Sequence, residues 1–245
     1  MLPGAFVPAN STGNMNPSDA LLILKQYPLF EKLSQGEYKE LSVSDNYKEA
    51  KKGEYIYFEA FQHKNIYFIK SGRIRLGYLD ESGERITKDI LGPGDFFGQI
   101  TLEKTDLNGE FAQAIRANVS LCSFTVDHFN QLLNNRPDMA VSYSKLIGLR
   151  MKRFENRLIN ILHKDVKQRL ILFLRQMLQE AKHPKVMNEI KIHIPNYLTH
   201  EEIAHLIGTS RQTVTALFNE FRDSGVCTYS RREIIFSDLK NLIGS

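Results

Sequence analysis

The spacing of hydrophobic and polar residues changes along the chain and predicts successive kinds of structure. Between Asn46 and Thr125, short runs rich in Tyr, Phe and Ile alternate with glycine-bearing turns. Many short strands separated by turns are typical of an antiparallel roll or barrel. We expect strands at Tyr55–Phe58, Ile66–Ile69, Ile74–Tyr78, Ile86–Leu91, Gln113–Ala117 and Val119–Phe124, and turns at Gly53, Ser71–Gly72, Ser82–Gly83 and Gly92–Gly94.

From Pro137 onward the period becomes helical. Apolar positions recur at alternating spacings of four and three, the pattern of a coiled-coil seam. We therefore expect a helix over residues 137–163 that pairs two copies of the chain through Ile147, Met151, Phe154, Leu158 and Ile161. A helix that lies on its own domain is the alternative, because Leu146 and Leu149 widen the apolar face. A further amphipathic helix is expected over Asp165–Ala181.

Two short helices joined by a glycine turn are predicted between His200 and Asn219. Thr199 and Glu202 form a capping box at the start of the first helix, and Ser210 is a good N-cap for the second. The apolar stripe of the second helix comprises Val214, Leu217, Phe218 and Phe221. Small Ala204, turn-forming Gly208 and branched Val214 have the spacing that a helix-turn-helix needs.

With this stripe buried, the polar residues of the second helix project outward. Arg211 can grip guanine with two hydrogen bonds, and Gln212 can pair with adenine; Thr215 and Asn219 share the same face. Thr199, Ser210 and Thr213 are candidates for phosphate contacts. An αα-hairpin with a solvated face is the competing interpretation. The run Val226–Tyr229 and the run Glu233–Phe236, joined through Ser230-Arg231-Arg232, resemble a two-stranded wing and favour DNA binding, with Arg231 at the tip.

Composition excludes several classes of protein, such as disulfide-rich and membrane-spanning proteins. The chain has 245 residues with 42% hydrophobic and 24% charged residues, which is ordinary for a globular protein, and a net charge of +4. Two cysteines exclude a disulfide framework and a four-cysteine metal site within one chain. No apolar run is long enough to span a membrane. We expect a cytoplasmic protein with a disordered tail (residues 1–17), a sensor roll (18–136), a dimerisation helix (137–163) and a winged helix-turn-helix domain (164–245).

These motifs, in this order, resemble the cyclic-AMP receptor/fumarate-nitrate regulator (Crp/Fnr) family of bacterial transcription factors. The resemblance rests on the roll with Pro93-Gly94-Asp95-Phe96-Phe97-Gly98, the long helix, Asp165-Val166 and the segment from Leu198 to Val214. It implies an α+β fold with an N-terminal antiparallel β-roll like a cyclic-nucleotide-binding domain. It also implies a homodimer that reads a near-palindromic operator in double-stranded DNA, with RNA polymerase as a further partner.

The residues at the family's cyclic-nucleotide contacts depart from the family pattern. The resemblance places the pocket at Phe97, Gly98, Gln99, Ile100, Phe111, Ala112, Phe154 and Glu155. Gln99 stands where nucleotide-binding members have Glu, and Phe111-Ala112 stands where they have Arg followed by Ser or Thr. In a regular strand Arg116, five residues after Phe111, faces the other way and cannot replace that Arg. We expect cyclic AMP to bind weakly or not at all, and the pocket either to take an apolar ligand or to be filled by side chains.

Other functions have less support from the sequence. No nucleophile–base set, phosphate-binding loop or metal-spaced His/Asp cluster is visible, so we expect no enzyme, no cofactor and no metal. We expect His63 to be a solvated loop residue rather than a haem ligand, and an N-terminal cysteine cluster is absent from the sequence. Two alternatives remain: a cyclic-nucleotide-responsive regulator with an altered pocket, and a regulatory subunit that does not bind DNA.

Overall fold

The computed structural model describes residues 27–34, 36–37, 47–58, 65–102, 109–181, 185–187 and 191–237. The predicted tail, the helix expected around Ala20–Leu24, most of the helix expected at Gln35–Leu41, and His63 lie outside these ranges. The chain divides into two compact units, Met1–Leu149 and Arg150–Ser245.

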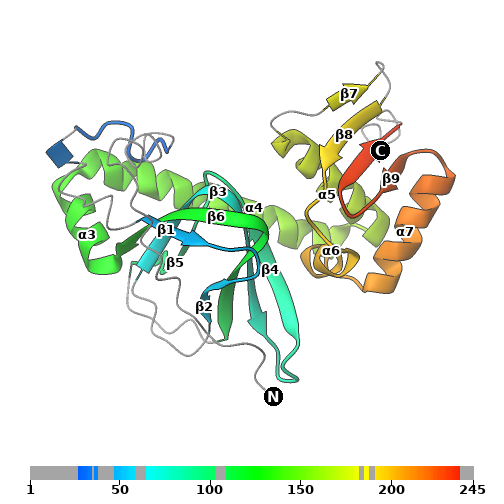
Figure 1. The fold of residues 1–245 in the computed structure, drawn as a ribbon, viewed down its shortest axis with the longest axis horizontal. Helices are drawn as coiled ribbons and strands as arrows, with labels where there is room; N and C mark the ends of the chain where they lie inside the picture. The colour runs from blue at the N-terminus through cyan, green and yellow to red at the C-terminus, as the bar shows by residue number, and fades with distance from the viewer. Residues whose placement is uncertain are drawn as a thin grey trace. The chain divides into compact units, whose positions relative to one another are not determined.

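The N-terminal unit is built on an antiparallel sheet, which confirms the predicted roll (Figure 1). Its strands are β1 (Tyr47–Ala50), β2 (Tyr55–Phe58), β3 (Asn65–Leu79), β4 (Arg85–Leu91), β5 (Phe96–Gly98) and β6 (Glu110–Thr125). They run in the order β1-β6-β3-β4, with β2 also paired to β6 and β5 to β3. The two long central strands carry most of the pairing, so the roll depends on contacts between segments far apart in the sequence.

Both long strands correct the prediction of separate short strands. The turn expected at Ser71–Gly72 is wrong: β3 continues through it, with shifts of register between Ile69 and Arg73. Gly72 has φ +83° there, a conformation that β-bulges use and that glycine adopts without strain. The break expected after Ala117 is likewise an irregularity within β6, where Arg116 has φ +66°. The premise of a regular strand around Arg116 is therefore wrong, although the Arg116 side chain is exposed.

The two faces of β3 enter two different cores because successive side chains of a strand point to opposite sides. Ile66 and Phe68 face a core that includes Phe30, Phe124 and Phe129. The alternate residues Tyr67 and Ile69 face the interior of the roll. The first core is closed by α3 (Val126–Asn135), which the sequence analysis did not predict, and by Met139 and Tyr143 of α4 (Pro137–His163).

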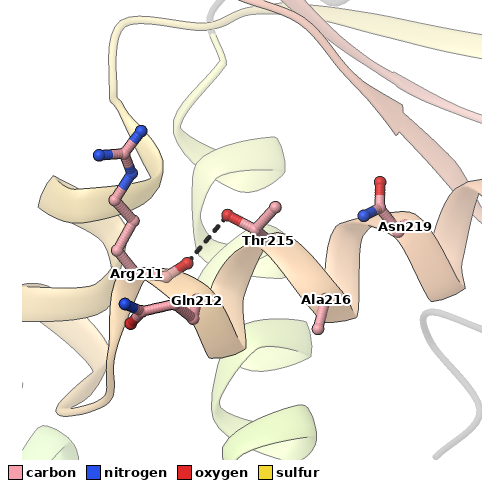
Figure 2. A pocket seen from close by; sticks show the side chains of 5 residues that line it. All are labelled: Arg211, Gln212, Thr215, Ala216 and Asn219. Atoms are coloured by element: carbon pink, nitrogen blue, oxygen red, sulfur yellow. Dashed lines mark hydrogen bonds between the residues drawn. The ribbon is translucent and has the colours of Figure 1, made fainter.

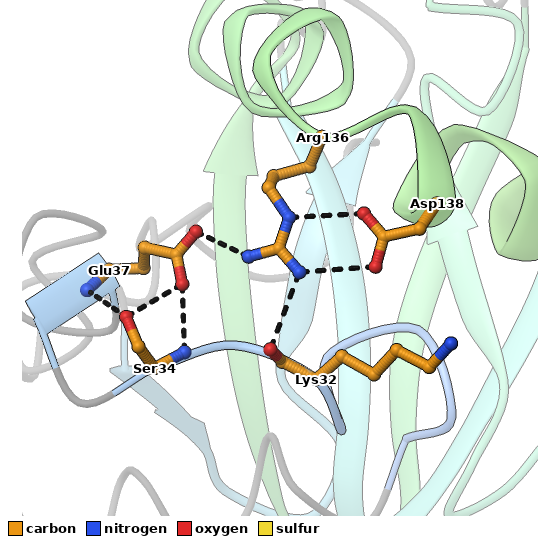
Figure 3. A network of polar contacts seen from close by, with 5 residues as sticks. All are labelled: Lys32, Ser34, Glu37, Arg136 and Asp138. Carbon is orange, nitrogen blue, oxygen red and sulfur yellow. Dashed lines mark hydrogen bonds and ion pairs between the residues drawn. The ribbon is translucent and has the colours of Figure 1, made fainter.

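Arg136 joins the end of α3 to the start of α4 and to the preceding chain (Figure 3). Its guanidinium donates two hydrogen bonds to Asp138, at 3.0 and 3.1 Å, and a third to the Lys32 carbonyl at 3.3 Å. It also pairs with Glu37, whose pKa is lowered to about 2 by hydrogen bonds from Ser34 and by Arg136. This network holds the segment around residue 34 against the helical end of the N-terminal unit.

The C-terminal unit contains the predicted pair of helices and a small antiparallel sheet. Its elements are the end of α4, α5 (Val166–Glu180), β7 (Lys185–Met187), β8 (Lys191–Pro195), α6 (His200–Ile207), α7 (Arg211–Asp223), β9 (Cys227–Tyr229) and β10 (Glu233–Phe236). Strands β9 and β10 form the predicted hairpin, and the sheet order is β7-β8-β10-β9. The first two strands were missed by the sequence analysis. Among the described residues, no helix has the length and apolarity to cross a membrane.

We predict that Gly72→Ala destabilises the roll more than Gly83→Ala does. Both glycines have φ near +80°, so both substitutions carry the backbone strain of that conformation. A Cβ at Gly72 would also lie 2.6 Å from the Asn118 carbonyl oxygen, whereas nothing lies within 4 Å at Gly83. The additional crowding should lower the free energy of unfolding by about 1–3 kcal/mol relative to Gly83→Ala. Denaturant titration of both variants measures the difference, and equal losses would contradict a continuous bulged β3.

Candidate nucleic-acid interface

Helix α6 begins with the capping box that the sequence predicts. The Glu202 amide donates to Thr199 Oγ1 at 3.2 Å, and the Thr199 amide donates to Glu202 Oε2 at 2.6 Å. Each residue thereby satisfies an amide that the first helical turn leaves without a partner. The helix buries Ile203, Ala204 and Ile207, the apolar face that the sequence pattern assigns to it.

The turn between α6 and α7 is held by Gly208 and by an arginine from α5. Gly208 ends α6 in the left-handed conformation, with φ +69° and ψ +55°, which glycine adopts without strain. Arg169 donates one hydrogen bond to the Gly208 carbonyl and another to the Ile161 carbonyl, both at 3.1 Å. A single guanidinium therefore links the turn to the end of α4 within the C-terminal unit.

Helix α7 buries one face and leaves the opposite face open. Ser210 caps its start by accepting from the Thr213 amide at 3.1 Å. Val214, Phe218 and Phe221 are buried. The other face forms a hollow that Figure 2 shows from close by, lined by Arg211, Gln212, Thr215, Ala216 and Asn219. The structure thus brings together four residues predicted to face DNA and adds Ala216 to them.

The three hydroxyl groups predicted for phosphate contact all lie at helix starts. Thr199 and Ser210 are the N-caps of α6 and α7, and Ser210 Oγ lies 2.9 Å from Thr213 Oγ1. The amides at a helix start carry the positive end of the helix dipole, which is a favourable place for an anion. Phosphate contact by these three residues remains a prediction.

The hairpin β9–β10 is fixed to the helix pair by residues that the sequence analysis missed. Asn196 donates from its side chain to the Ser230 carbonyl at 2.6 Å and from its amide to the Arg232 carbonyl at 2.9 Å. The Tyr229 hydroxyl donates to the Leu198 carbonyl. These bonds hold the tip of the hairpin, where Arg231 and Arg232 are exposed, close to the start of α6. A lone Asn before the helix gave no sequence signal for this role.

The ring of His200, at the start of α6, contacts residues of both α7 and β9. The imidazole stacks on Phe218 at 5.1 Å between centroids and lies 4.4 Å from the ring of Tyr229. Its Nδ1 lies 2.8 Å from Oγ1 of Thr215. Burial, and secondly the positive charge of Arg211, lower the pKa of His200 below its ordinary value. The sequence pattern gave no signal for this role of His200.

In the roll, most of the residues predicted to lie at the family's nucleotide contacts are buried. Gln99 is 1% exposed and donates to Thr101 Oγ1 at 3.0 Å. Phe97 stacks on Tyr67 with centroids 5.0 Å apart, and Ala112 belongs to the same interior cluster. Gly98 lies at the end of β5 and Ile100 in the turn that follows.

Phe111 contacts a different set of rings from those of Phe97. It lies 5.8 Å from Tyr55 and 6.2 Å from Phe58, and it is fully buried. In the C-terminal unit, the guanidinium groups of Arg150 and Arg157 lie over the Phe154 ring at 5.8 and 5.9 Å. Glu155, next to it, pairs with Lys152 at 3.3 Å. In the described part of the chain, no group of three or more His, Cys, Asp or Glu side chains is placed to hold a metal ion.

We predict that the His200 imidazole titrates below its ordinary pKa of 6.5. Because burial and the charge of Arg211 favour the neutral ring, His200 should carry less charge than a solvated histidine at the same pH. Arg211→Ala removes one of the two causes and should move the pKa upward. Imidazole chemical shifts followed by NMR over pH 4 to 8 measure both values. A wild-type pKa at or above 6.5 would show that the ring is not enclosed as described.

Each of the two units of the chain contains a segment that matches a known domain family. Residues 47–136 match the cyclic nucleotide-binding domain, and residues 168–244 match the Crp-like helix-turn-helix domain. The chain is 26% identical over 191 residues to the CRP-like cAMP-activated global transcriptional regulator of Mycobacterium tuberculosis, covering 78% of this chain and 84% of that protein. It is 27% identical over 180 residues to the global nitrogen regulator of Synechocystis, covering 73% and 79%.

Solved structures share the fold. A CooA variant from Carboxydothermus hydrogenoformans superposes with a TM-score of 0.69 at 24% identity, covering 90% of this chain and 93% of that one. FixK2 from Bradyrhizobium japonicum gives a TM-score of 0.67 at 18% identity, covering 81% and 95%. With the helix-turn-helix, the roll and these relatives in agreement, the chain belongs to the Crp/Fnr family of DNA-binding transcription regulators.

Proposed function

We propose that this regulator is a homodimer that inserts two copies of α7 into successive major grooves of a near-palindromic operator. The observation that supports this most is the open polar face of α7, where Arg211, Gln212 and Asn219 are exposed opposite a buried apolar stripe. Two such helices on a two-fold dimer read half-sites about one helical turn, roughly 34 Å, apart.

The side chains of this face suit direct reading of bases. The arginine fork of Arg211 matches the O6 and N7 acceptors of guanine, and the amide of Gln212 matches the N6 and N7 of adenine. At the hairpin, Arg231 is positioned for the phosphate backbone, which adds affinity without sequence preference.

Dimerisation is proposed to use the apolar seam of α4. Met151, Leu158 and Ile161 are 62%, 57% and 41% exposed in the single chain, and Phe154 is 37% exposed. They recur at spacings of three and four along one side of the helix, as coiled-coil partners require. Ile147, at the N-terminal end of the seam, packs partly on the core of the roll unit. Burying such a row against a second copy removes it from water, which favours association.

We further propose that the roll does not use cyclic AMP in the family's usual way. Gln99 takes the place of a carboxylate, and Phe111-Ala112 takes the place of the phosphate-binding pair; all three are buried in protein contacts. Losing the cationic partner of a buried phosphate costs several kcal/mol, about two to four decades in dissociation constant.

Any effector would act through the junction between α4 and the DNA-reading helices. Asp165 caps α5 just after α4 ends, and Arg169 on α5 holds both the Ile161 and Gly208 carbonyls. A ligand shifts this junction only to the extent that it binds one of its states better than the other. RNA polymerase in the cytoplasm is the partner through which the bound dimer would change transcription.

We predict that Arg211→Ala relaxes sequence preference at one base position of each half-site, at a cost of about 1–3 kcal/mol. The measurement uses an operator selected from random duplexes by the full-length protein, with each base then varied. Arg231→Ala is the matched control: it should weaken binding about equally on every sequence and reduce the salt dependence. A uniform loss with Arg211→Ala would make Arg211 a phosphate contact, and failure to select any sequence would overturn the proposed function.

We predict that Leu158→Glu converts the dimer to a monomer. A carboxylate in a dry apolar seam is costly, so dissociation should rise by at least about a hundredfold. Leu149→Glu, at a similarly exposed position outside the seam, should leave the dimer intact. Sedimentation velocity distinguishes the two. A monomeric wild-type protein, or a dimeric Leu158→Glu variant, would contradict the proposal that this seam forms the dimer interface.

We predict that isothermal titration with cyclic AMP gives no dissociation constant in the micromolar range. A value in the low micromolar range or tighter would instead support a cyclic-nucleotide-responsive regulator with an altered pocket.

A further inference from the structure

We infer that Thr215 reads the methyl group of a thymine, because the helix backbone takes the only hydrogen of its hydroxyl group and His200 fixes the hydroxyl oxygen. The inference rests on the proposed function, since it requires α7 to lie in the major groove. Beyond that function, Thr215 becomes a base-reading residue that acts through its methyl group, and His200 on α6 becomes the residue that positions it.

The hydroxyl group of Thr215 has two neighbours within the protein. Oγ1 donates to the Arg211 carbonyl at 2.9 Å, one helical turn back (Figure 2), and lies 2.8 Å from Nδ1 of His200. A hydroxyl carries a single hydrogen. With that hydrogen on the Arg211 carbonyl, Oγ1 must accept from the Nδ1–H of His200, so the hydroxyl has no hydrogen left for a thymine O4 or a guanine O6.

The packing of His200 leaves Thr215 as the hydrogen-bond partner of its ring. Its ring is fixed by stacking on Phe218 and by contact with Tyr229. Its other nitrogen, Nε2, is buried and has no hydrogen-bond partner among the described residues. A neutral ring with the hydrogen on Nδ1 leaves Nε2 without a hydrogen to place, which fits this surrounding better than the other tautomer.

The second lone pair of Oγ1 can accept only from a base donor such as adenine N6 or cytosine N4. Toward thymine, which presents the O4 acceptor and a methyl group, the methyl group of Thr215 is the group that remains. Thr215 lines the same hollow as Arg211, Gln212 and Asn219, and Figure 2 shows its methyl carbon on the side away from the Arg211 carbonyl. Threonine methyl groups recognise thymine by apolar contact with its C5-methyl group, which is exposed in the major groove. Fixing the side chain in this rotamer makes Thr215 an apolar reader rather than a polar one.

The test replaces each thymine of the selected operator by deoxyuridine, which removes only the C5-methyl group. With the full-length wild-type protein, one thymine in each half-site should show a three- to fivefold loss of affinity, about the value of one buried methyl group. Thr215→Ser removes the reading methyl and should bind the thymine and uracil operators equally. Thr215→Val keeps that methyl and should keep the discrimination.

His200 is tested by the same ratio of thymine to uracil affinity. His200→Phe retains a ring for the stack but lacks the donor, and it should reduce the ratio. His200→Asn places an amide nitrogen near the position of Nδ1 and should restore it. A merely structural role would lower affinity for both operators alike and leave the ratio unchanged. Thr228→Ser, the same chemical change at an exposed position of β9, is the control and should leave the ratio as in the wild type.

The outcomes separate this inference from the proposed function. An operator that is selected but contains no thymine sensitive to uracil, or a Thr215→Ser variant that keeps the discrimination, overturns the inference and leaves the DNA-binding function standing. A loss of discrimination in Thr215→Val overturns it as well, because the hydroxyl would then be the reading group. Failure to select any sequence removes both.

Discussion

The burial of one side of α7 against α6 determines what the other side can present to DNA. Val214, Phe218 and Phe221 are at most 4% exposed, and they recur on one face of the helix. Side chains of a helix point in directions set by a fixed rotation per residue. Because the apolar face is held in the core, the direction in which the polar face points is fixed as well. The exposed positions of Arg211, Gln212 and Asn219 are therefore a consequence of apolar packing. In the proposed function, the chemistry of these side chains supplies sequence preference because the packing fixes the direction in which they point.

The same packing couples the hairpin to the helices. Phe218 contacts both His200 at the start of α6 and Tyr229 on β9, with the Tyr229 ring 4.6 Å from its own. Three consecutive elements, α6, α7 and β9, thus share one aromatic cluster directly behind the exposed polar side of α7. A second layer of this kind restricts the rotamers of the residues that touch the ligand, which is how binding geometry becomes reproducible. Thr215 contacts this cluster through His200 and also lines the hollow on the exposed side of α7.

Local periodicity was enough to predict the helices from α4 to α7, whereas α3 was missed. The 3.6-residue pattern and the capping residues Thr199 and Ser210 are contained within one or two turns of chain, and the structure confirms both caps. The long strands were not predicted as continuous, because Ser71-Gly72 has the same local composition in a bulge as in a turn. Only pairing with β6, far along the chain, distinguishes the two.

In the candidate site too, some features could be predicted from local sequence and others depend on tertiary packing. The outward face of α7 follows from the sequence, since it is the complement of an apolar stripe. The contact between His200 and Thr215 does not, because it depends on the angle at which α6 meets α7 and on the rotamer of a hydroxyl group. Asn196 and Tyr229 were missed for a similar reason: their partners are backbone carbonyls, which carry no sequence signal. In the roll, Phe111 and Phe97 are both buried, but pairing of the strands places them with different neighbours.

Methylation interference on a selected operator tests the central claim, that α7 reads base edges from the major groove. Guanine N7 lies in the major groove and adenine N3 in the minor groove, so methylating each probes one groove. Our account predicts that N7 methylation blocks binding at two symmetric clusters about one helical turn apart, and that N3 methylation does not block binding within those clusters. Interference by adenine N3 methylation alone, or a single cluster without a symmetric partner, would contradict it.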